Sequence, residues 1–332
     1  MNQLNILTGI KPTGDPHIGN YIGAIKPALQ LSENDEYQSI YFIANYHALT
    51  SIREAEKLNE LSYSIAATWL ALGLNPEKTI FYRQSDVPEI FELSWILSCY
   101  ASKGLLNRAH AYKAIVDTNT QLGAEVDSGV NMGLFTYPIL MAADILLFHS
   151  SVVPVGKDQI QHVEIARDIA EQFNKTYGQT FTLPQYKVDE DTSVLPGLDG
   201  RKMSKSYNNT IPIFAKSSDL KKLIYKIKTD SLQPNEPKDP NTSTLFQIYS
   251  QFAELDQINN LRDNFTQGIG WGQVKEIVFQ QLDEVLTEPR EKYYALLNNR
   301  HTVNEILKNG AEKARGIAIP YLDEIKKKIG IQ

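Results

Sequence analysis

The chain has 332 residues, of which 42% are hydrophobic, 10% aromatic and 22% charged. This size and composition are typical of a globular protein of about two domains and exclude fibrous and disordered chains. The formal net charge of −6 argues against general electrostatic binding to nucleic acid, and we expect no binding to DNA. A polyanionic ligand would therefore have to bind to local basic patches.

Two absences in the sequence favour a cytoplasmic location. The N-terminal residues lack a basic stretch followed by a long apolar run, so no signal peptide is predicted. The longest apolar candidate for a membrane span, about residues 137–148, is interrupted by Asp144. The single cysteine, Cys99, cannot form an internal disulfide, and we interpret it as a small core residue in a reducing compartment.

The first two thirds of the chain alternate between short strand patterns and longer helical patterns. Runs rich in branched and aromatic residues predict strands at 4–9, 39–45, 78–84 and 151–156. Apolar residues at helical spacing predict helices at 18–31, 54–72, 89–101 and 159–177. This repetition indicates an α/β fold, a parallel sheet with helices on both faces, whose ligands bind at the carboxyl ends of the strands.

The rest of the chain departs from this alternation in two places. Residues 103–133 form a polar stretch that predicts either a functional flap or a helical hairpin insertion. After about Asn209 the strand patterns end, and helical patterns follow, separated by Pro-rich and Gly-rich stretches. We therefore expect two domains, at residues 1–209 and 210–332, the second all-helical.

The first candidate for chemistry is TGIKPTGDPHIGN, residues 8–20, which follows the first predicted strand. Its three glycines and two prolines predict a sharp turn, and a helix begins at about His17. Free N–H groups and the helix dipole would then face a phosphate group, with the His17 imidazole beside a developing oxyanion. The loop has neither a Walker ending nor a GxGxxG fingerprint, and an ordinary Gly/Pro turn is the alternative.

The second candidate is GRKMSKSYNN, residues 200–209, which matches no helical or strand period. Three cationic side chains lie within six residues, those of Arg201, Lys202 and Lys205. The stretch is either a solvated turn or a mobile loop whose Lys202 and Lys205 close over a triphosphate and offset the charge on leaving pyrophosphate.

Together, HIGN and KMSKS resemble the two signature motifs of class I aminoacyl-tRNA synthetases. Asn20 stands where the family usually has the second histidine of HIGH, a change that its tryptophan and tyrosine branch tolerates. The resemblance implies a Rossmann-like, doubly wound parallel sheet as catalytic domain and an all-helical C-terminal domain. It also implies ATP as substrate, Mg²⁺ bound mainly through ATP, and catalytic roles for His17, Asn20, Lys202 and Lys205.

The predicted helix at 137–148 presents a carboxylate on an apolar face. Tyr137, Met141, Asp144 and Phe148 share that face by helical spacing. An unpaired buried carboxylate is costly, so Asp144 must accept hydrogen bonds. The donor is either a protein group, for example Arg167 in an ion pair, or an N–H of an aromatic ligand.

Residues 133–148 and 152–174 resemble bacterial tryptophanyl-tRNA synthetases in particular. The resemblance implies that Asp144 accepts the indole N–H of tryptophan and that four further residues line this site: Tyr137, Met141, Gln159 and Leu7. It implies that ATP contacts Lys11, Pro12, Thr13, Gly19, Asn20, Gly156, Lys157, Asp158, Val194, Lys202, Met203, Ser204, Lys205 and Ser206. Asp158 is also a candidate helix N-cap.

Two positions depart from the pattern of these relatives. Ile115 lies two residues beyond Lys113, where some relatives have a second lysine, which leaves open how the flap contributes to pyrophosphate binding. Leu7 stands where some relatives have an aromatic residue beside the indole, so the tryptophan site would be built differently there.

The resemblance implies ATP-dependent ligation of L-tryptophan to tRNA(Trp) through tryptophanyl-adenylate, releasing AMP and pyrophosphate, by a homodimer. The helical domain would hold the anticodon, with basic candidates at Lys221, Lys222, Lys226, Lys228, Lys326, Lys327 and Lys328. The alternatives are a tyrosyl-tRNA synthetase, a catalytically silent RNA-binding paralogue and a small-molecule nucleotidyltransferase. The six histidines show no metal-ligand spacing, and we expect no resident metal.

Overall fold

The computed structural model describes residues 3–188 and 195–332, and its centre is a parallel sheet. The strands are all parallel in the order β3-β2-β1-β4-β5, so successive strands are added on one side of β1 up to β3 and on its other side from β4. The carboxyl end of β1 therefore borders the crevice where such sheets bind ligands. The strands are β1 (Leu4–Ile10), β2 (Tyr37–Ile43), β3 (Ile80–Arg83), β4 (Val152–Pro154) and β5 (Gln185–Lys187).

The two faces of the sheet are buried by different helices because successive strand residues point to opposite sides. On one face, Leu7 and Phe42 belong to a core with helices α5, α8 and α9. On the other face, Ile6 and Tyr41 pack with α2 and α4. The helices concerned are α2 (Lys26–Ser32), α4 (Ala55–Ala71), α5 (Glu89–Ser98), α8 (Met132–Leu146) and α9 (Ile160–Tyr177). This is the predicted Rossmann-like, doubly wound arrangement.

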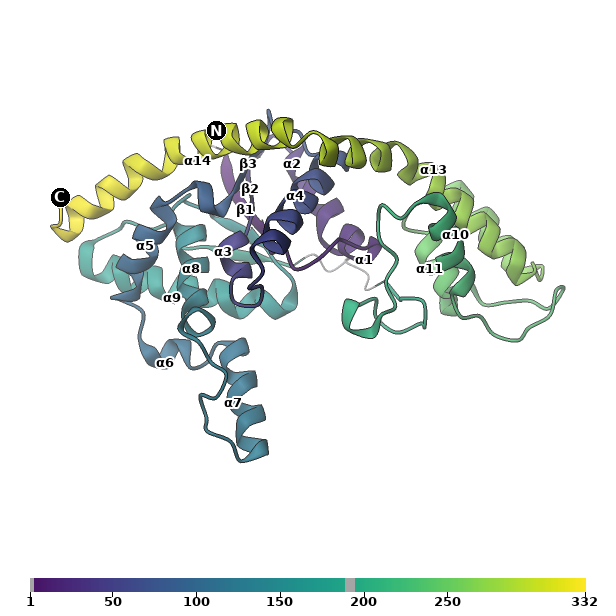
Figure 1. Cartoon of the computed structure of the whole chain (residues 1–332), viewed down its shortest axis with the longest axis horizontal. Coiled ribbons are helices and arrows are strands. Elements are labelled where there is room, and N and C mark those ends of the chain that lie inside the picture. The colour runs from purple at the N-terminus through teal and green to yellow at the C-terminus, as the bar shows by residue number, and fades with distance from the viewer. Residues whose placement is uncertain (1–2, 189–194) are drawn as a thin grey trace.

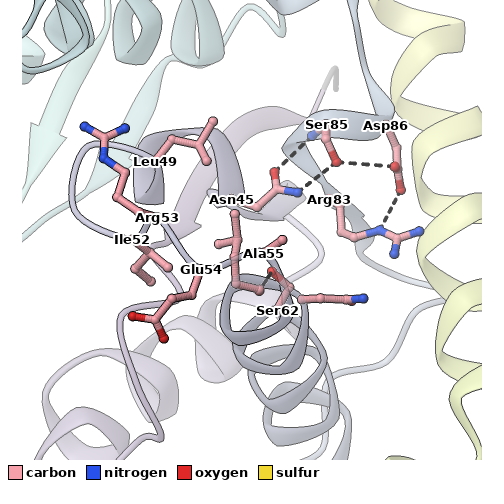
Figure 2. Close-up of a pocket in the computed structure, with 12 residues that line it drawn as sticks. Asn45, Leu49, Ile52, Arg53, Glu54, Ala55, Ser62, Arg83, Ser85 and Asp86 are labelled. Atoms are coloured by element: carbon pink, nitrogen blue, oxygen red, sulfur yellow. Dashed lines mark hydrogen bonds and ion pairs between the residues drawn. The ribbon is translucent and has the colours of Figure 1, made fainter.

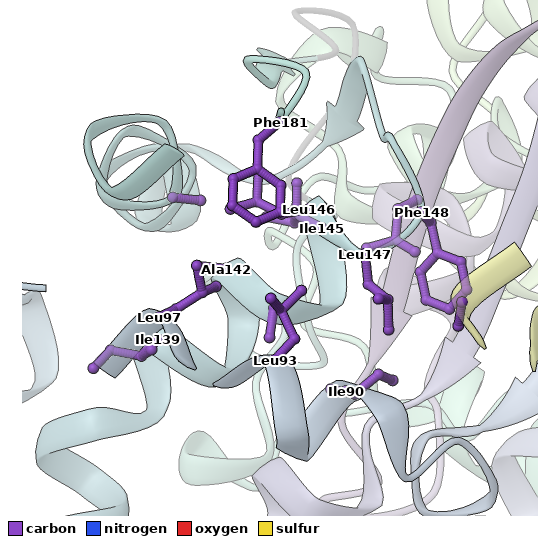
Figure 3. Close-up of a cluster of buried hydrophobic side chains, with 14 of the residues drawn as sticks. Ile90, Leu93, Leu97, Ile139, Ala142, Ile145, Leu146, Leu147, Phe148 and Phe181 are labelled. Carbon is purple, nitrogen blue, oxygen red and sulfur yellow. The ribbon is translucent and has the colours of Figure 1, made fainter. Parts of the chain in front are cut away.

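Figure 3 shows the first of these cores, where α5 and α8 lie against each other. Leu93 and Leu97 of α5 face Ala142 and Ile145 of α8, and all four are buried. Cys99 lies just beyond α5 and is exposed, so the expectation of a core cysteine was wrong. The apolar spacing of α5 continues through Leu97, but the residue two positions later already faces solvent.

Residues 103–133 contain two helices joined by turns, and a role of this insertion as a functional flap stays a prediction. Helices α6 (Lys103–Leu106) and α7 (His110–Leu122) precede α8, and α7 projects away from the sheet (Figure 1). The connection from β1 to α2 contains α1 (Ile18–Asn20) and the π-helical turn η1 (Tyr21–Ile25). The connection from β2 to α4 contains α3 (Asn45–Ala48).

In the described chain beyond residue 209, all the regular elements are helical. Helices α10 (Ser217–Lys226), α11 (Thr244–Tyr249), α12 (Leu255–Thr266) and α13 (Trp271–Asn298) surround a core that also includes Ile18 and Ile22 after β1 and Ala67 of α4. Helix α14 (Arg300–Ile329) then runs back over the edge strand β3 and packs against α5 (Figure 1). The division of the chain at residues 209 and 210 stays a prediction, and α14 connects its two parts.

None of the helices in the described ranges is long and apolar enough to cross a membrane.

Candidate active site

The loop after β1 ends in the short helix α1, which begins next to His17 as predicted. His17 is the N-cap of α1: its Nδ1 accepts the Asn20 N–H at 3.2 Å, and Asn20 Oδ1 accepts the His17 N–H at 3.1 Å. Because Nδ1 is an acceptor, the proton of the neutral ring resides on Nε2. Burial, and then the charge of Lys205, lower the pKa of His17 to about 4. The ring is therefore a neutral N–H donor at pH 7.

The KMSKS loop lies directly on this first loop. A Cβ atom on Gly14 would lie 2.7 Å from Lys205 Nζ, and one on Gly19 would lie 3.5 Å from Met203 Cβ. Met203 is buried, whereas Lys202, Lys205 and Ser206 are exposed. Two sequence-distant motifs thus meet at the carboxyl end of β1, with the Lys205 ammonium beside the turn at Gly14. Partial burial lowers the pKa of Lys205.

Asn209 holds the KMSKS loop in shape. Its Oδ1 accepts the Ser204 N–H at 2.8 Å, and its Nδ2 donates to Lys202 O at 3.1 Å and to Asp199 Oδ1 at 2.7 Å. Arg201 plays a different part, since its guanidinium pairs with Asp199 and covers the Tyr207 ring. Of the three cations in this loop, Lys205 is the one that the structure places against the first loop.

Asp144 is fully buried, and its carboxylate accepts hydrogen bonds from two other elements. His47 Nε2 lies 2.8 Å from Oδ2, and Gln84 Nε2 lies 2.9 Å from Oδ1 and 3.0 Å from Oδ2. Burial raises the pKa of Asp144, and the bonds from His47 and Gln84 oppose this rise. The prediction that Arg167 pairs with Asp144 was wrong. Arg167 Nε lies 3.4 Å from Glu171 Oε1 instead.

A second polar chain begins at Tyr137, about two turns before Asp144 on the same face of α8. The Tyr137 hydroxyl bonds to His162 Nε2, His162 Nδ1 bonds to Gln159 Oε1 at 2.9 Å, and Gln159 Nε2 donates to Asp158 Oδ2 at 3.0 Å. The carboxylate can only accept, so the whole chain is polarised: Tyr137 donates to His162 and its oxygen keeps its lone pairs. Burial lowers the pKa of His162 to about 4 and raises that of Tyr137 to about 12, which keeps both groups neutral.

The two polar networks are adjacent, because the His47 ring meets the Tyr137 ring edge to face with centroids 6.3 Å apart. The sequence-based prediction missed His47, Gln84 and His162. His47 and Gln84 follow the carboxyl ends of β2 and β3, which is the only signal that could have found them. For His162, the spacing of the histidines predicted no role.

The remaining predicted residues lie around the same crevice. Lys11 Nζ donates to Thr50 Oγ1 at 2.9 Å, while Pro12 is buried and Thr13 exposed. Gly156, Lys157 and Asp158 form the exposed turn between β4 and α9; Gln159, not Asp158, occupies the N-cap of α9. Leu7 is a core residue of β1, Met141 is partly buried beside the same core, and Ser204 Oγ bonds to Ser206 Oγ. The prediction for Val194 lies outside the described residues.

Comparison with known proteins identifies the class of this arrangement. The model of the family "tRNA synthetases class I (W and Y)" matches residues 1–287, and the chain belongs to that family.

Within the family, the chain is similar to bacterial tryptophan–tRNA ligases. It is 52% identical to that of Pseudomonas aeruginosa over 98% of this chain and 74% of the relative. It is 48% identical to that of Neisseria meningitidis over 100% of this chain and 99% of the relative. A solved tryptophanyl-tRNA synthetase of Campylobacter jejuni, complexed with ADP and tryptophan, is 47% identical with a TM-score of 0.90, covering 98% of this chain and 100% of its own.

Proposed function

We propose that this chain ligates L-tryptophan to tRNA(Trp) in two steps. Tryptophan and ATP first form tryptophanyl-adenylate and pyrophosphate, and a terminal ribose hydroxyl of the tRNA then takes the tryptophanyl group and releases AMP. The observation that carries the proposal is the meeting of the two signature loops at Gly14 and Lys205, in a chain about half identical to tryptophan–tRNA ligases.

The first step needs no enzyme nucleophile. A tryptophan carboxylate oxygen attacks the α-phosphorus of ATP, and the bond from that phosphorus to the departing pyrophosphate breaks. Positioning and charge stabilisation supply the catalysis. His17 Nε2–H, Asn20 and the ammonium groups of Lys202 and Lys205 donate to phosphate oxygens whose charge grows as the bond breaks. Lys11, Thr13 and Gly19 line the same phosphate path.

The ATP site extends from the first loop to the turn after β4. We assign Gly156, Lys157 and Asp158 to the ribose side and Met203, with Val194, to the adenine side. Mg²⁺ belongs to this proposal as an ion held mainly by ATP oxygens, because it retains most of its water and needs few protein ligands. In residues 3–188 and 195–332, no group of three or more His, Cys, Asp or Glu side chains could hold a metal ion.

The tryptophan side chain binds between Asp144, Met141 and Leu7, with the indole N–H donating to Asp144. The α-ammonium group donates to Tyr137 and Gln159. The Tyr137 hydroxyl oxygen and Gln159 Oε1 can both accept from a cation. The Tyr137 hydroxyl donates its proton to His162, so the lone pairs of its oxygen stay available. A site built to bond a substrate N–H rejects an amino acid that lacks it by roughly 10⁴-fold or more.

The helical part of the chain holds the anticodon in this proposal. Several of the candidate lysines pair with carboxylates: Lys221 with Glu276, Lys222 with Asp219, Lys326 with Glu92 and Asp323, and Lys328 with Glu324. Lys226 and Lys228 are exposed beside these pairs and are therefore the better phosphate contacts. A cytoplasmic homodimer completes the proposal, and Trp95 of α5, which is 73% exposed, is a candidate contact of the dimer.

Amino-acid-dependent ATP–pyrophosphate exchange tests the function directly. We expect exchange with tryptophan alone among the twenty amino acids, followed by charging of tRNA(Trp). Exchange with tyrosine would favour the tyrosyl-tRNA synthetase alternative, because Asp144 would then accept a hydrogen bond from a phenol hydroxyl. No exchange with any amino acid would favour a silent RNA-binding paralogue.

A further inference from the structure

Gln84 is a fully buried amide that connects the Asp144 carboxylate to the backbone at the end of β2. Its Nε2 contacts both Asp144 oxygens, at 2.9 and 3.0 Å, and its Oε1 accepts the Tyr46 N–H at 3.2 Å. A backbone N–H can only donate, so this contact fixes which end of the amide faces Asp144. A flipped amide would place its oxygen against the carboxylate and its NH₂ against another donor.

The contact between Gln84 and Tyr46 is reinforced by the pair of residues beside it. Asn45 Nδ2 donates to Ser85 Oγ at 2.8 Å, and Asn45 Oδ1 accepts the Ser85 N–H at 3.1 Å. Figure 2 shows these reciprocal bonds between the segments that follow β2 and β3. Two consecutive residue pairs thus join the two segments, and the Gln84 amide has a rigid base.

We infer that Gln84 is a positioning residue for tryptophan recognition, which holds the Asp144 carboxylate so that an acceptor lone pair faces the indole N–H. A carboxylate has about four acceptor sites. Gln84 contacts one side of each oxygen and His47 takes a further site on Oδ2, which leaves Oδ1 with capacity for one more donor. This inference rests on the proposed function, because it concerns how the same site recognises tryptophan.

Holding the carboxylate matters because discrimination by a hydrogen bond depends on angle as well as distance. Asp144 sits on α8, and its side chain could rotate about its terminal torsion, which is broad. The Gln84 amide, just after β3, donates to both oxygens and His47 of α3 donates to one of them, which fixes that rotation. The carboxylate is thereby preorganised before the substrate binds, so binding loses no free energy in ordering this side chain.

The test is Gln84→Met, which keeps the side-chain length and removes both amide functions. kcat/KM for ATP–pyrophosphate exchange is measured with tryptophan and with β-(3-benzothienyl)alanine, in which sulfur replaces the indole N–H. We expect the preference for tryptophan to fall about tenfold or more, while KM for ATP changes by less than about twofold. A purely structural role would slow both substrates alike, and an unchanged preference would overturn the inference.

Tyr82→Phe is the matched control. The Tyr82 hydroxyl is buried two residues from Gln84 and near Asp144, but it has no hydrogen-bond partner within the described residues. Removing it should leave the tryptophan preference unchanged; an equal loss of preference in this variant would assign the effect to general polarity and overturn the inference. Thermal unfolding of each variant, followed by circular dichroism, verifies that it is folded.

If Gln84→Met does not fold, Gln84→Glu keeps the shape of the side chain and places a second carboxyl group against Asp144. Two adjacent carboxyl groups repel or share a proton, so the preference for tryptophan should again fall. An unchanged preference in Gln84→Glu would contradict the inference. Wild-type exchange with tryptophan separates this outcome from failure of the proposed function, which would be seen without any variant.

Discussion

At the scale of single residues, the site works with neutral donors and fixed protons. The cap between His17 and Asn20 sets the imidazole tautomer, and burial keeps the ring uncharged. The chain from Tyr137 to Asp158 is polarised by a carboxylate at its far end in the same way. In the proposed site, positive charge reaches the phosphates from Lys11 of the first loop and from the lysines of the KMSKS loop. The KMSKS loop contacts the first loop through two side chains, Lys205 beside Gly14 and Met203 beside Gly19.

Lys205→Ala should lower the rate of adenylate formation by about 10²- to 10³-fold, because it removes a donor that acts on the growing charge of pyrophosphate. The Kd for tryptophan should stay the same, since Lys205 lies at the first loop and not at Asp144. Single-turnover pyrophosphate release and equilibrium tryptophan binding measure the two quantities separately. Arg201→Ala is the control in the same loop, because Arg201 pairs with Asp199 and points elsewhere. Equal loss in both variants would contradict the assignment.

His162 makes stability depend on pH. Its pKa is lowered from 6.5 to about 4 by burial, so the unfolded chain takes up a proton at a higher pH than the folded chain does. Between pH 6.5 and about 4 the unfolded state binds more protons, and the free energy of unfolding falls as the pH falls. His162→Gln should lose less stability over this window than the wild type. Urea unfolding at pH 7.5 and pH 5 measures the difference, and equal pH dependence would contradict the prediction.

The sequence predicted the residues that lie in recognisable motifs but not those that support them. His17, Lys205 and Asp144 stand out because their chemistry is conspicuous at their positions in the chain. Gln84 and His47 follow ordinary strands, and no local pattern indicates that two strand ends converge on one carboxylate. That convergence depends on the order β3-β2-β1-β4-β5, which a single sequence does not specify.

At the scale of elements, the KMSKS loop keeps a defined shape although it contains little regular structure. Asn209 bonds to the backbone of Ser204 and Lys202 and to the Asp199 side chain, and it is 2% exposed. A Cβ atom on Gly197 would lie 2.4 Å from the Asn209 side chain, so a glycine is required for this close approach. Asn209 therefore holds the segment that carries Lys202 and Lys205 in one shape.

Asn209→Ala should lower kcat for exchange by about 10-fold or more while leaving KM for tryptophan within about twofold, because the lysines lose their shared frame. Steady-state exchange kinetics measure both constants. Asn208→Gly is the neighbouring control: Asn208 has a φ of 49°, which glycine adopts without strain. A large loss in Asn208→Gly as well would indicate that any change in the loop is harmful, and the specific role of Asn209 would fail.

The elements themselves followed from periodicity wherever they were long or apolar. β5 was missed, because its three residues are exposed and carry no apolar pattern. The insertion at 103–133 is polar, as a loop would be, but it also has helical spacing. The sequence therefore left its conformation open, and the structure contains α6 and α7 there. Short exposed elements depend on their neighbours, so sequence patterns identify them poorly.

At the scale of the whole molecule, α14 joins the helical part of the chain to the sheet. It begins beside the carboxyl end of α13 and covers the edge strand β3, whose backbone would otherwise be free to pair with another chain (Figure 1). Val303 and Leu307 enter the core on one face of the sheet, and Ala314 and Ala318 enter the core on the other. A motion of the helical part can therefore reach the sheet through α14 as well as through α13, which packs against α4.

Gly310 lies where α14 closely approaches the backbone of β3, and it provides a test of this connection. A Cβ atom there would lie 1.8 Å from the Phe81 carbonyl oxygen, so Gly310→Ala must push the helix away from β3. We expect a loss of about 1–3 kcal/mol or more in the free energy of unfolding, as for other overpacked sites. Gly316→Ala, on the same helix with open space around it, should instead gain about 0.5–1 kcal/mol from helix propensity. Chemical denaturation of both variants measures the contrast, and a neutral or stabilising Gly310→Ala would mean that α14 does not rest on β3 in solution.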